Sequence, residues 1–234
     1  MERQFLLIHG GSHGGWCWQP LIQQLQLGGA SAWAPDLPGH GLDSTPRQTV
    51  DRKRYLDFID DWFELNDVQD LILVGHSLAG ILLPDIAIRH AGRLSEVIFL
   101  AAMVCEPGQR PIDLIPKERR QSYFDVAEQS IENVIFWPYE MARAVFFSDL
   151  SEQQARWAYR QLTPQPFQVY LDPVPQADIK IPIRYLACAE DRCLPLRLCE
   201  ESASRLGVEM ELIDSGHDVM LSQPERLAEE LLRS

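Results

Sequence analysis

The stretch Leu71-Ile72-Leu73-Val74-Gly75-His76-Ser77-Leu78-Ala79-Gly80 joins an apolar run directly to a tight turn of small residues. We predict a buried strand over 71–74 and a helix over 81–89. A serine on so sharp a turn between strand and helix has its hydroxyl held out at the carboxyl edge of a sheet. Ser77 is therefore a candidate nucleophile, although an exposed serine in a glycine-rich turn fits this short motif equally well.

The composition of the 234-residue chain, 46% hydrophobic and 24% charged, fits one α/β domain with insertions. Its 34 acidic residues outnumber 21 basic ones, and the net charge of −13 argues against nucleic acid as a partner. Only four apolar residues follow Met1-Glu2-Arg3-Gln4, and no apolar run reaches membrane-spanning length. We therefore expect a cytoplasmic protein with no membrane partner.

The cysteines give no metal or disulfide pattern. There are five, an odd number on separate predicted elements, with no CxxC pair and no histidine at metal-ligand spacing: Cys17, Cys105, Cys188, Cys193 and Cys199. We expect reduced, mostly buried thiols, and neither a metal nor an organic cofactor.

Apolar runs and amphipathic segments alternate along most of the chain. Further strands are predicted at 5–8, 31–34, 97–101, 183–187 and 210–213. Further helices are predicted at 16–27, at 50–65 with Thr49 as its cap, at 196–206, and from Ser222 with Glu225 as its capping-box partner. Repeated strand-helix units predict a mostly parallel central sheet with helices on both faces, and a ligand site at the carboxyl ends of the strands.

The alternation stops between Met103 and Lys180, where proline and aromatic residues are frequent. Helices are predicted at 116–129, 138–147 and 151–162, and no good buried strand is present. Such an insertion above the carboxyl edge of a sheet would act as a helical cap. We therefore expect a core domain formed by 1–102 and 181–234, with a cap over 103–180.

A nucleophilic serine needs a base, an acid and donors for a developing oxyanion. Of the six histidines, His217 follows the last predicted strand directly and is the best candidate base. Asp191, shortly after the strand over 183–187, is the candidate acid, with Glu190 and Glu106 as alternatives. The backbone N–H of Leu78 begins a helix, and the N–H of Gly11 lies in a glycine-rich loop, so these two are candidate oxyanion donors.

These segments together resemble the α/β-hydrolase superfamily, and within it the small esterase and hydroxynitrile lyase group that includes plant methylesterases and bacterial esterases. The resemblance is carried by His9-Gly10-Gly11-Ser12-His13-Gly14-Gly15-Trp16-Cys17-Trp18, Asp36-Leu37-Pro38-Gly39-His40-Gly41, Gly75 to Gly80, Glu190-Asp191, Gly216-His217, and the cap segments Phe147-Ser148-Asp149 and Leu162-Thr163-Pro164-Gln165-Pro166. It implies an α/β-hydrolase fold and the same triad and oxyanion donors. Ala79 departs from the pattern, which usually has glycine there. Members of the group are often dimers, which leaves a homodimer open.

Two positions separate esterases from lyases in this group. The lyases carry threonine where this chain has Gly10 and lysine where it has Asp218, so cyanohydrin cleavage is disfavoured. Superfamily members with an aspartate nucleophile are disfavoured by Ser77. We expect a serine carboxylesterase acting on small-molecule esters with small to medium, apolar or aromatic groups. A C–C bond hydrolase or lactonase with the same triad, and a non-catalytic binding protein, remain the alternatives.

Candidate substrate contacts come from two regions. Phe124, Phe136 and Trp137 of the predicted cap supply aromatic surface, with packing of the cap onto the core as their alternative role. Ser12 and His13 adjoin the predicted oxyanion loop and are candidates on that ground.

Overall fold

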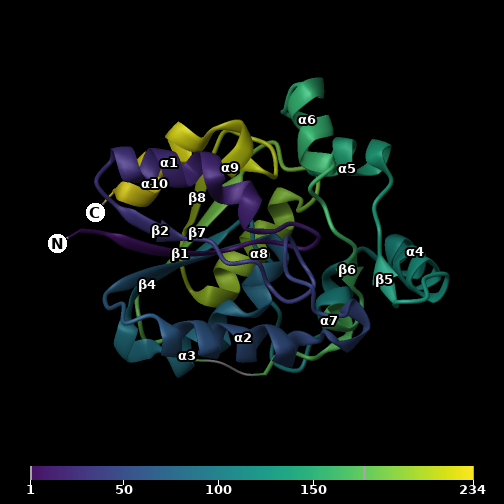
Figure 1. Ribbon diagram of the computed structural model, residues 1–234, viewed down its shortest axis with the longest axis horizontal. Helices are drawn as coiled ribbons and strands as arrows, with labels where there is room; N and C mark the ends of the chain where they lie inside the picture. Colours follow the sequence, from purple (N-terminus) through teal and green to yellow (C-terminus); the bar gives the residue numbers. More distant parts are fainter. Residues whose placement is uncertain (1, 176–177, 234) are drawn as a thin grey trace.

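A computed structural model describes residues 2–175 and 178–233. The protein has a sheet between helices, with a cap at one end (Figure 1). The sheet has six strands in the order β2-β1-β3-β4-β7-β8, and every neighbouring pair is parallel. Its strands are β1 (Gln4–Ile8), β2 (Ser31–Trp33), β3 (Leu71–His76), β4 (Leu94–Leu100), β7 (Ile183–Cys188) and β8 (Met210–Ile213). All six residues of β3 are buried, as expected for a central strand covered on both faces.

Helices cover both faces of the sheet, which confirms the predicted fold class. Figure 1 shows three helices above the sheet: α1 (Gln19–Leu27), α9 (Val219–Ser222) and α10 (Pro224–Leu232). Two helices lie below it: α2 (Arg52–Leu65) and α3 (Leu83–Arg89). Helix α8 (Leu196–Leu206) connects β7 to β8 and contacts both. Short 3₁₀ turns complete the core: η1 (Gly15–Trp18), η2 (Arg47–Thr49), η3 (Ser77–Ile81) and η4 (Ala91–Arg93).

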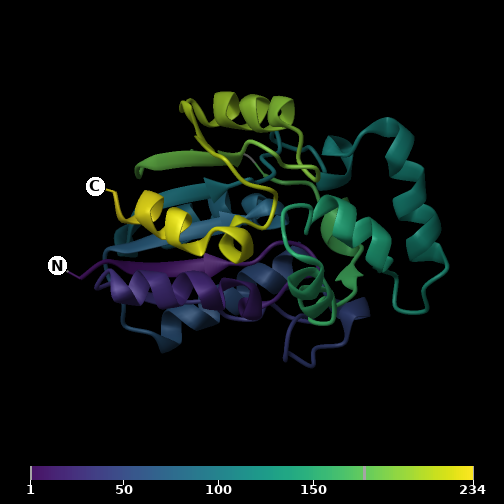
Figure 2. The ribbon, with the colours of Figure 1, turned by 90° about the horizontal axis from the view of Figure 1, so that it is seen from above.

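The segment between β4 and β7 lies beyond the carboxyl ends of the strands, at the right of Figures 1 and 2. It contains η5 (Pro111–Leu114), α4 (Lys117–Glu128), β5 (Val134–Ile135), α5 (Tyr139–Val145), α6 (Glu152–Tyr159), β6 (Gln165–Pro166) and α7 (Gln168–Leu171). We call this segment the cap. The antiparallel β5–β6 pair and α7 were not predicted, because elements of two to four residues are too short to show a periodic pattern. The domain bounds themselves stay a prediction.

Two predicted helix caps are wrong. Helix α2 begins after Asp51, whose carboxylate accepts the N–H of Arg54 at 2.7 Å, whereas Thr49 ends the preceding 3₁₀ turn and its hydroxyl donates to Pro46 O. A carboxylate beside the unpaired amides of a helix start is the stronger cap. Ser222 belongs to α9, and α10 begins at Pro224 without a side-chain cap. Proline has no N–H to satisfy and its φ suits a first helical turn.

The first predicted helix divides into η1 and α1, with Pro20 in the first turn of α1. All five cysteines fall within the described residues and are free, and Cys17, Cys188 and Cys199 are buried. In the described part of the chain, no helix combines the length and apolar character needed to cross a bilayer.

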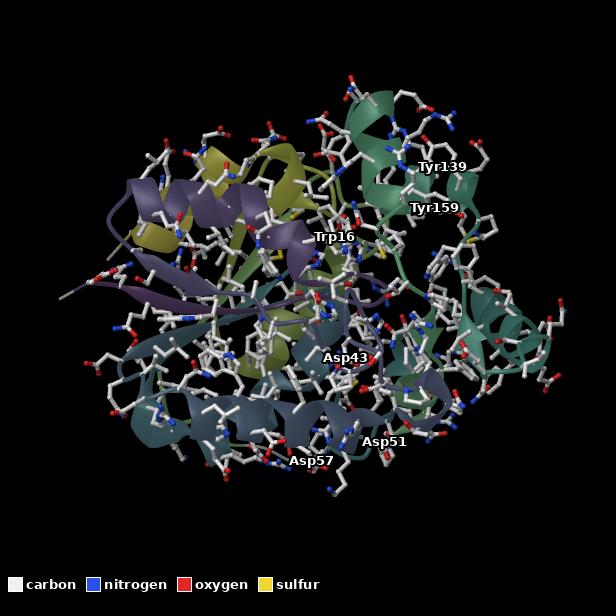
Figure 3. All side chains as sticks on the ribbon, viewed as in Figure 1. Trp16, Asp43, Asp51, Asp57, Tyr139 and Tyr159 are labelled. Atoms are coloured by element: carbon white, nitrogen blue, oxygen red, sulfur yellow. The ribbon has the colours of Figure 1, made fainter. Side chains whose placement is uncertain are left out.

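Replacing Asp51 with alanine should lower the free energy of unfolding by about 1 kcal/mol, because the N-terminal amides of α2 lose their acceptor. Figure 3 labels Asp51 at the start of this helix. Urea unfolding of the D51A variant measures the change. Thr49→Ala, at the position predicted from the sequence, is the matched control and should change stability by less than about 0.5 kcal/mol. A larger loss for Thr49→Ala than for Asp51→Ala would contradict the cap assignment.

Candidate active site

Ser77 is the first residue of η3, directly after β3, and lies in a strained turn with φ of 54°. Few residues other than glycine adopt a positive φ, and such strain is concentrated at functional sites. Neighbouring glycines make the turn possible. A Cβ at Gly80 would lie 2.4 Å from Met103 O, and a Cβ at Gly10 would lie 2.9 Å from Ser77 Cβ. Ala79 is buried in the same turn, so the alanine is accommodated.

The three residues predicted as nucleophile, base and acid form one hydrogen-bonded chain. Ser77 Oγ lies 3.0 Å from His217 Nε2, and His217 Nδ1 lies 2.7 Å from Asp191 Oδ2. Asp191 follows β7 and His217 follows β8, and these strands are neighbours, so both side chains reach the edge where β3 ends. The other oxygen of Asp191 accepts the N–H groups of Cys193 and Leu194 at 2.7 and 2.8 Å.

These contacts define the proton positions. A carboxylate only accepts, so His217 Nδ1 carries a proton, and in the neutral ring Nε2 accepts from Ser77. The ring of His217 is buried, which by itself lowers its pKa, but the adjacent Asp191 carboxylate outweighs burial and holds the pKa well above its usual value. Of the alternative acids, Glu106 lies 3.5 Å from Arg205, and Glu190 is exposed.

The predicted oxyanion donors lie beside Ser77 with their amides free. Neither Gly11 N–H nor Leu78 N–H donates a hydrogen bond to any of the described residues. The next amide, that of Ser12, is instead held by Gln165 Oε1 of β6 at 3.0 Å. This buried cap side chain was not predicted, and it fixes the loop at Ser12, where φ is 65°. The two free amides can therefore serve an anion near Ser77.

Ser12 and His13 do not line the cavity described below, so the structure does not bring these two predicted substrate contacts to its wall. His13 is buried, with Nδ1 at 2.8 Å from Gly11 O and Nε2 at 2.8 Å from Asp218 Oδ2. Both oxygens are acceptors, so a ring nitrogen that carries a proton donates to the oxygen it faces. His13 also stacks on Trp16, which Figure 3 labels. Ser12 and His13 thus hold the oxyanion loop in place from the side away from the cavity.

A cluster of His76, His217 and Asp218 has atoms within 4.8 Å of one another, a spacing that a metal ion could accept. Hydrogen bonds already engage one atom each of His76 and Asp218 and both nitrogens of His217, while His76 Nδ1 and Asp218 Oδ1 have no partner among the described residues. His76 Nε2 contacts His217 O at 3.1 Å, Asp218 binds His13, and both nitrogens of His217 serve Ser77 and Asp191. The arrangement therefore fits a hydrogen-bonded network better than a ligand set.

A cavity of about 460 Å³ opens at Ser77 and Gly11 between the core and the cap. Trp137 lines it, as predicted. Phe136 does not, because its side chain is 49% exposed and packs on Tyr159, and Phe124 does not, because it packs edge-on against Phe167. The remaining wall is Met103, Leu114, Ile115, Pro116, Glu118, Arg119, Tyr123, Phe146, Tyr170, Cys193, Leu194, Pro195, Arg197, Leu198 and Glu201.

Residues 5–230 match the sequence pattern of the Alpha/beta hydrolase family. The chain belongs to this family. Pheophorbidase from Raphanus sativus is 29% identical over 257 aligned positions, which cover 98% of this chain and 93% of that protein. The carbendazim hydrolyzing esterase of a Nocardioides strain is 26% identical, with 97% of each chain covered.

Solved structures agree with this assignment. An extracellular alpha/beta-hydrolase from a Paenibacillus species has a TM-score of 0.87, with 26% identity and 98% of each chain covered. The methylesterase MES16 of Arabidopsis has a TM-score of 0.83 at 23% identity, with 99% of this chain and 98% of that chain covered, which shows the shared fold. The predicted resemblance to the plant methylesterase group of α/β hydrolases is confirmed.

Several residues of this α/β-hydrolase site were missed at the level of the sequence. Cys193 and Leu194 could have been found, because they lie two and three positions after Asp191. Tyr123, Tyr170 and Arg119 had no such signal. They come from the cap, where short helices of mixed polarity do not reveal which face is turned inward.

Replacing Asp218 with asparagine should destabilise the fold by about 3 kcal/mol, because the buried ring of His13 loses its charged partner. Burial raises the pKa of Asp218, but the charge of His13 outweighs it and lowers the pKa overall. The carboxylate's contribution is therefore complete above about pH 4 and is lost as the pH falls through the lowered pKa. Urea unfolding at pH 7 is the measurement. Asp214→Asn, at an exposed position after β8, is the control, and equal stability of the two variants would contradict the pairing.

Proposed function

We propose that this α/β hydrolase is a serine esterase that cleaves carboxylic esters through a covalent acyl-enzyme. The observation that carries the proposal is the chain Ser77–His217–Asp191 at the wall of a cavity beside two free backbone amides. The names of similar proteins, a pheophorbidase, methylesterases and a carbendazim hydrolyzing esterase, support ester cleavage.

In the proposed mechanism, His217 Nε2 accepts the proton of Ser77 as the serine oxygen attacks the ester carbonyl. Negative charge develops on the carbonyl oxygen, and the amides of Gly11 and Leu78 donate to it. Asp191 orients the ring of His217 and stabilises its cationic form. The ring then returns the proton to the leaving alcohol, and a water activated by the same nitrogen releases the acid and regenerates Ser77.

Cyanohydrin cleavage fits the site poorly. A threonine in place of Gly10 would bring its Cβ within 2.9 Å of Ser77 Cβ and 3.1 Å of His76 Nδ1 in this backbone. Asp218, where the resembling lyases carry lysine, is a buried carboxylate already paired with His13. It places negative charge next to His217, which disfavours a cyanide leaving group.

A C–C bond hydrolase or a lactonase would use the same triad, and comparison of esters, lactones and β-diketones as substrates separates these activities. The cytoplasmic location, the lack of a nucleic-acid partner and the homodimer stay predictions. The expected substrate body, apolar or aromatic, agrees with the aromatic wall that Trp137, Phe146 and Tyr123 give the cavity.

Replacing Ser77 with alanine should abolish hydrolysis of a short nitrophenyl ester, with a loss of at least about four orders of magnitude in kcat. A fluorophosphonate should label the native chain and leave this variant unlabelled. Ser95→Ala removes an exposed hydroxyl on β4 and is the control. Unchanged turnover by the Ser77→Ala variant in a clean preparation would refute the proposal.

Replacing Asp191 with asparagine should lower kcat by roughly three to four orders of magnitude. His217 must be neutral to act as a base, and its raised pKa places the acid limb of the pH profile above about 6.5. Without the carboxylate the pKa falls, so the acid limb should move to lower pH. Profiles of kcat/KM against pH test this, with the exposed neighbour variant Glu190→Gln as control. An acid limb that does not move in the Asp191→Asn variant would argue for a different acid.

A further inference from the structure

The cavity beside Ser77 carries hydrogen-bond donors that the proposed mechanism does not use. Tyr123 of α4 and Tyr170 of α7 both line it, and each is 7% exposed. Among the described residues, no hydrogen bond involves either phenol oxygen, and neither oxygen is among the fully enclosed polar atoms without a partner, so both are open to the cavity. Because both hydroxyls are open to the cavity and are not used within the protein, they are available to donate to acceptor atoms of a ligand there.

Arg119, in the first turn of α4, lines the same cavity and is half-buried. No carboxylate among the described residues forms an ion pair with it. The other arginine of the wall, Arg197, is paired with Glu201 at 2.9 Å. Glu118 is exposed. Among the described residues of the wall, Arg119 is thus the arginine whose charge is available to bind a ligand.

One of these donors, Tyr170, lies beside the ester site, and Tyr123 packs against it. Tyr170 Oη would be 3.6 Å from a Cβ built on Gly11, which places this hydroxyl next to the oxyanion loop. The rings of Tyr123 and Tyr170 pack edge-on with centroids 5.5 Å apart. Burial raises the pKa of both phenols, so both remain donors at neutral pH.

An apolar wall completes the cavity on the side of the base. Ring centroids are 5.5 Å apart between Tyr123 and Trp137, 5.5 Å between Trp137 and Phe146, and 5.9 Å between Phe146 and His217. A substrate body placed against this wall has Ser77 at one end and shares the cavity with the hydroxyls of Tyr123 and Tyr170 and with Arg119.

We propose that Arg119, Tyr123 and Tyr170 form a carboxylate-binding subsite, and that the substrates are monoesters carrying a second, free carboxylate on an apolar or aromatic body. A guanidinium fork with two hydroxyls matches the acceptor positions of a carboxylate. The substrate part of this inference rests on the proposed esterase function, because the ester is placed at Ser77.

The test uses matched pairs of substrates, the monomethyl and dimethyl esters of dicarboxylic acids from succinate to sebacate. The native enzyme should prefer at least one monoester over its dimethyl ester. Arg119→Gln should lower that preference, expressed as the ratio of kcat/KM values, by roughly ten- to a hundredfold and mainly through KM. Tyr170→Phe should lower it by a smaller factor. Lys117→Gln removes a charge from the exposed side of the same turn and should leave the ratio unchanged.

Binding of suberate to the Ser77→Ala variant, measured by calorimetry with and without Arg119→Gln, separates the two claims. Weaker binding after Arg119→Gln, with no ester turned over by the native enzyme, would support the subsite and refute the esterase. The opposite outcome is that the enzyme hydrolyses dimethyl esters normally and that Arg119→Gln changes neither suberate binding nor the substrate ratio. That outcome would overturn the subsite but not the esterase function. If Lys117→Gln lowered the substrate ratio as much as Arg119→Gln does, the preference would come from long-range charge attraction, and the subsite would be overturned.

Discussion

The hydrogen bond between Ser77 Oγ and His217 Nε2 joins residues 140 positions apart, and the fold around it is arranged to keep these atoms 3.0 Å apart. The parallel sheet brings the ends of β3, β7 and β8 to one edge. The positive φ of Ser77 turns its hydroxyl out of the sheet, and the close approach of Gly10 and Gly80 makes that turn possible. Loss of either glycine would require the backbone around Ser77 to shift.

Two buried histidine-aspartate pairs lie side by side at this edge of the sheet and have different roles. His217 with Asp191 faces Ser77, and its raised pKa suits a base whose cationic form must be stabilised. His13 with Asp218 faces away from the cavity, and through Gly11 O it holds the loop that presents a free amide. Because His217 and Asp218 are adjacent in sequence, movement of either pair would disturb the other.

The cap contributes to the site as well as covering it. Gln165 holds the Ser12 amide, and Asp149 accepts the N–H of Gly216 at 2.7 Å, next to the base. Thr163 contacts His40 on the core loop at 2.8 Å. The cap also supplies the tyrosines and Arg119 of the cavity wall. Removal of the cap would therefore loosen both loops of the site in addition to opening the cavity.

The sequence by itself determined the parallel fold and the order of Ser77, Asp191 and His217, because buried parallel strands are continuous apolar runs and their carboxyl ends share one edge. It could not assign the start of α2, where neighbouring polar residues compete, or the start of α10, which has no side-chain cap. It also could not assign the directions of Phe124, Phe136 and His13. Only the tertiary structure decided these, together with the pairing of His13 with Asp218 and the inward face of Arg119. Side chains in short, irregular segments take their direction from the surfaces they pack against, and those surfaces come from distant parts of the chain.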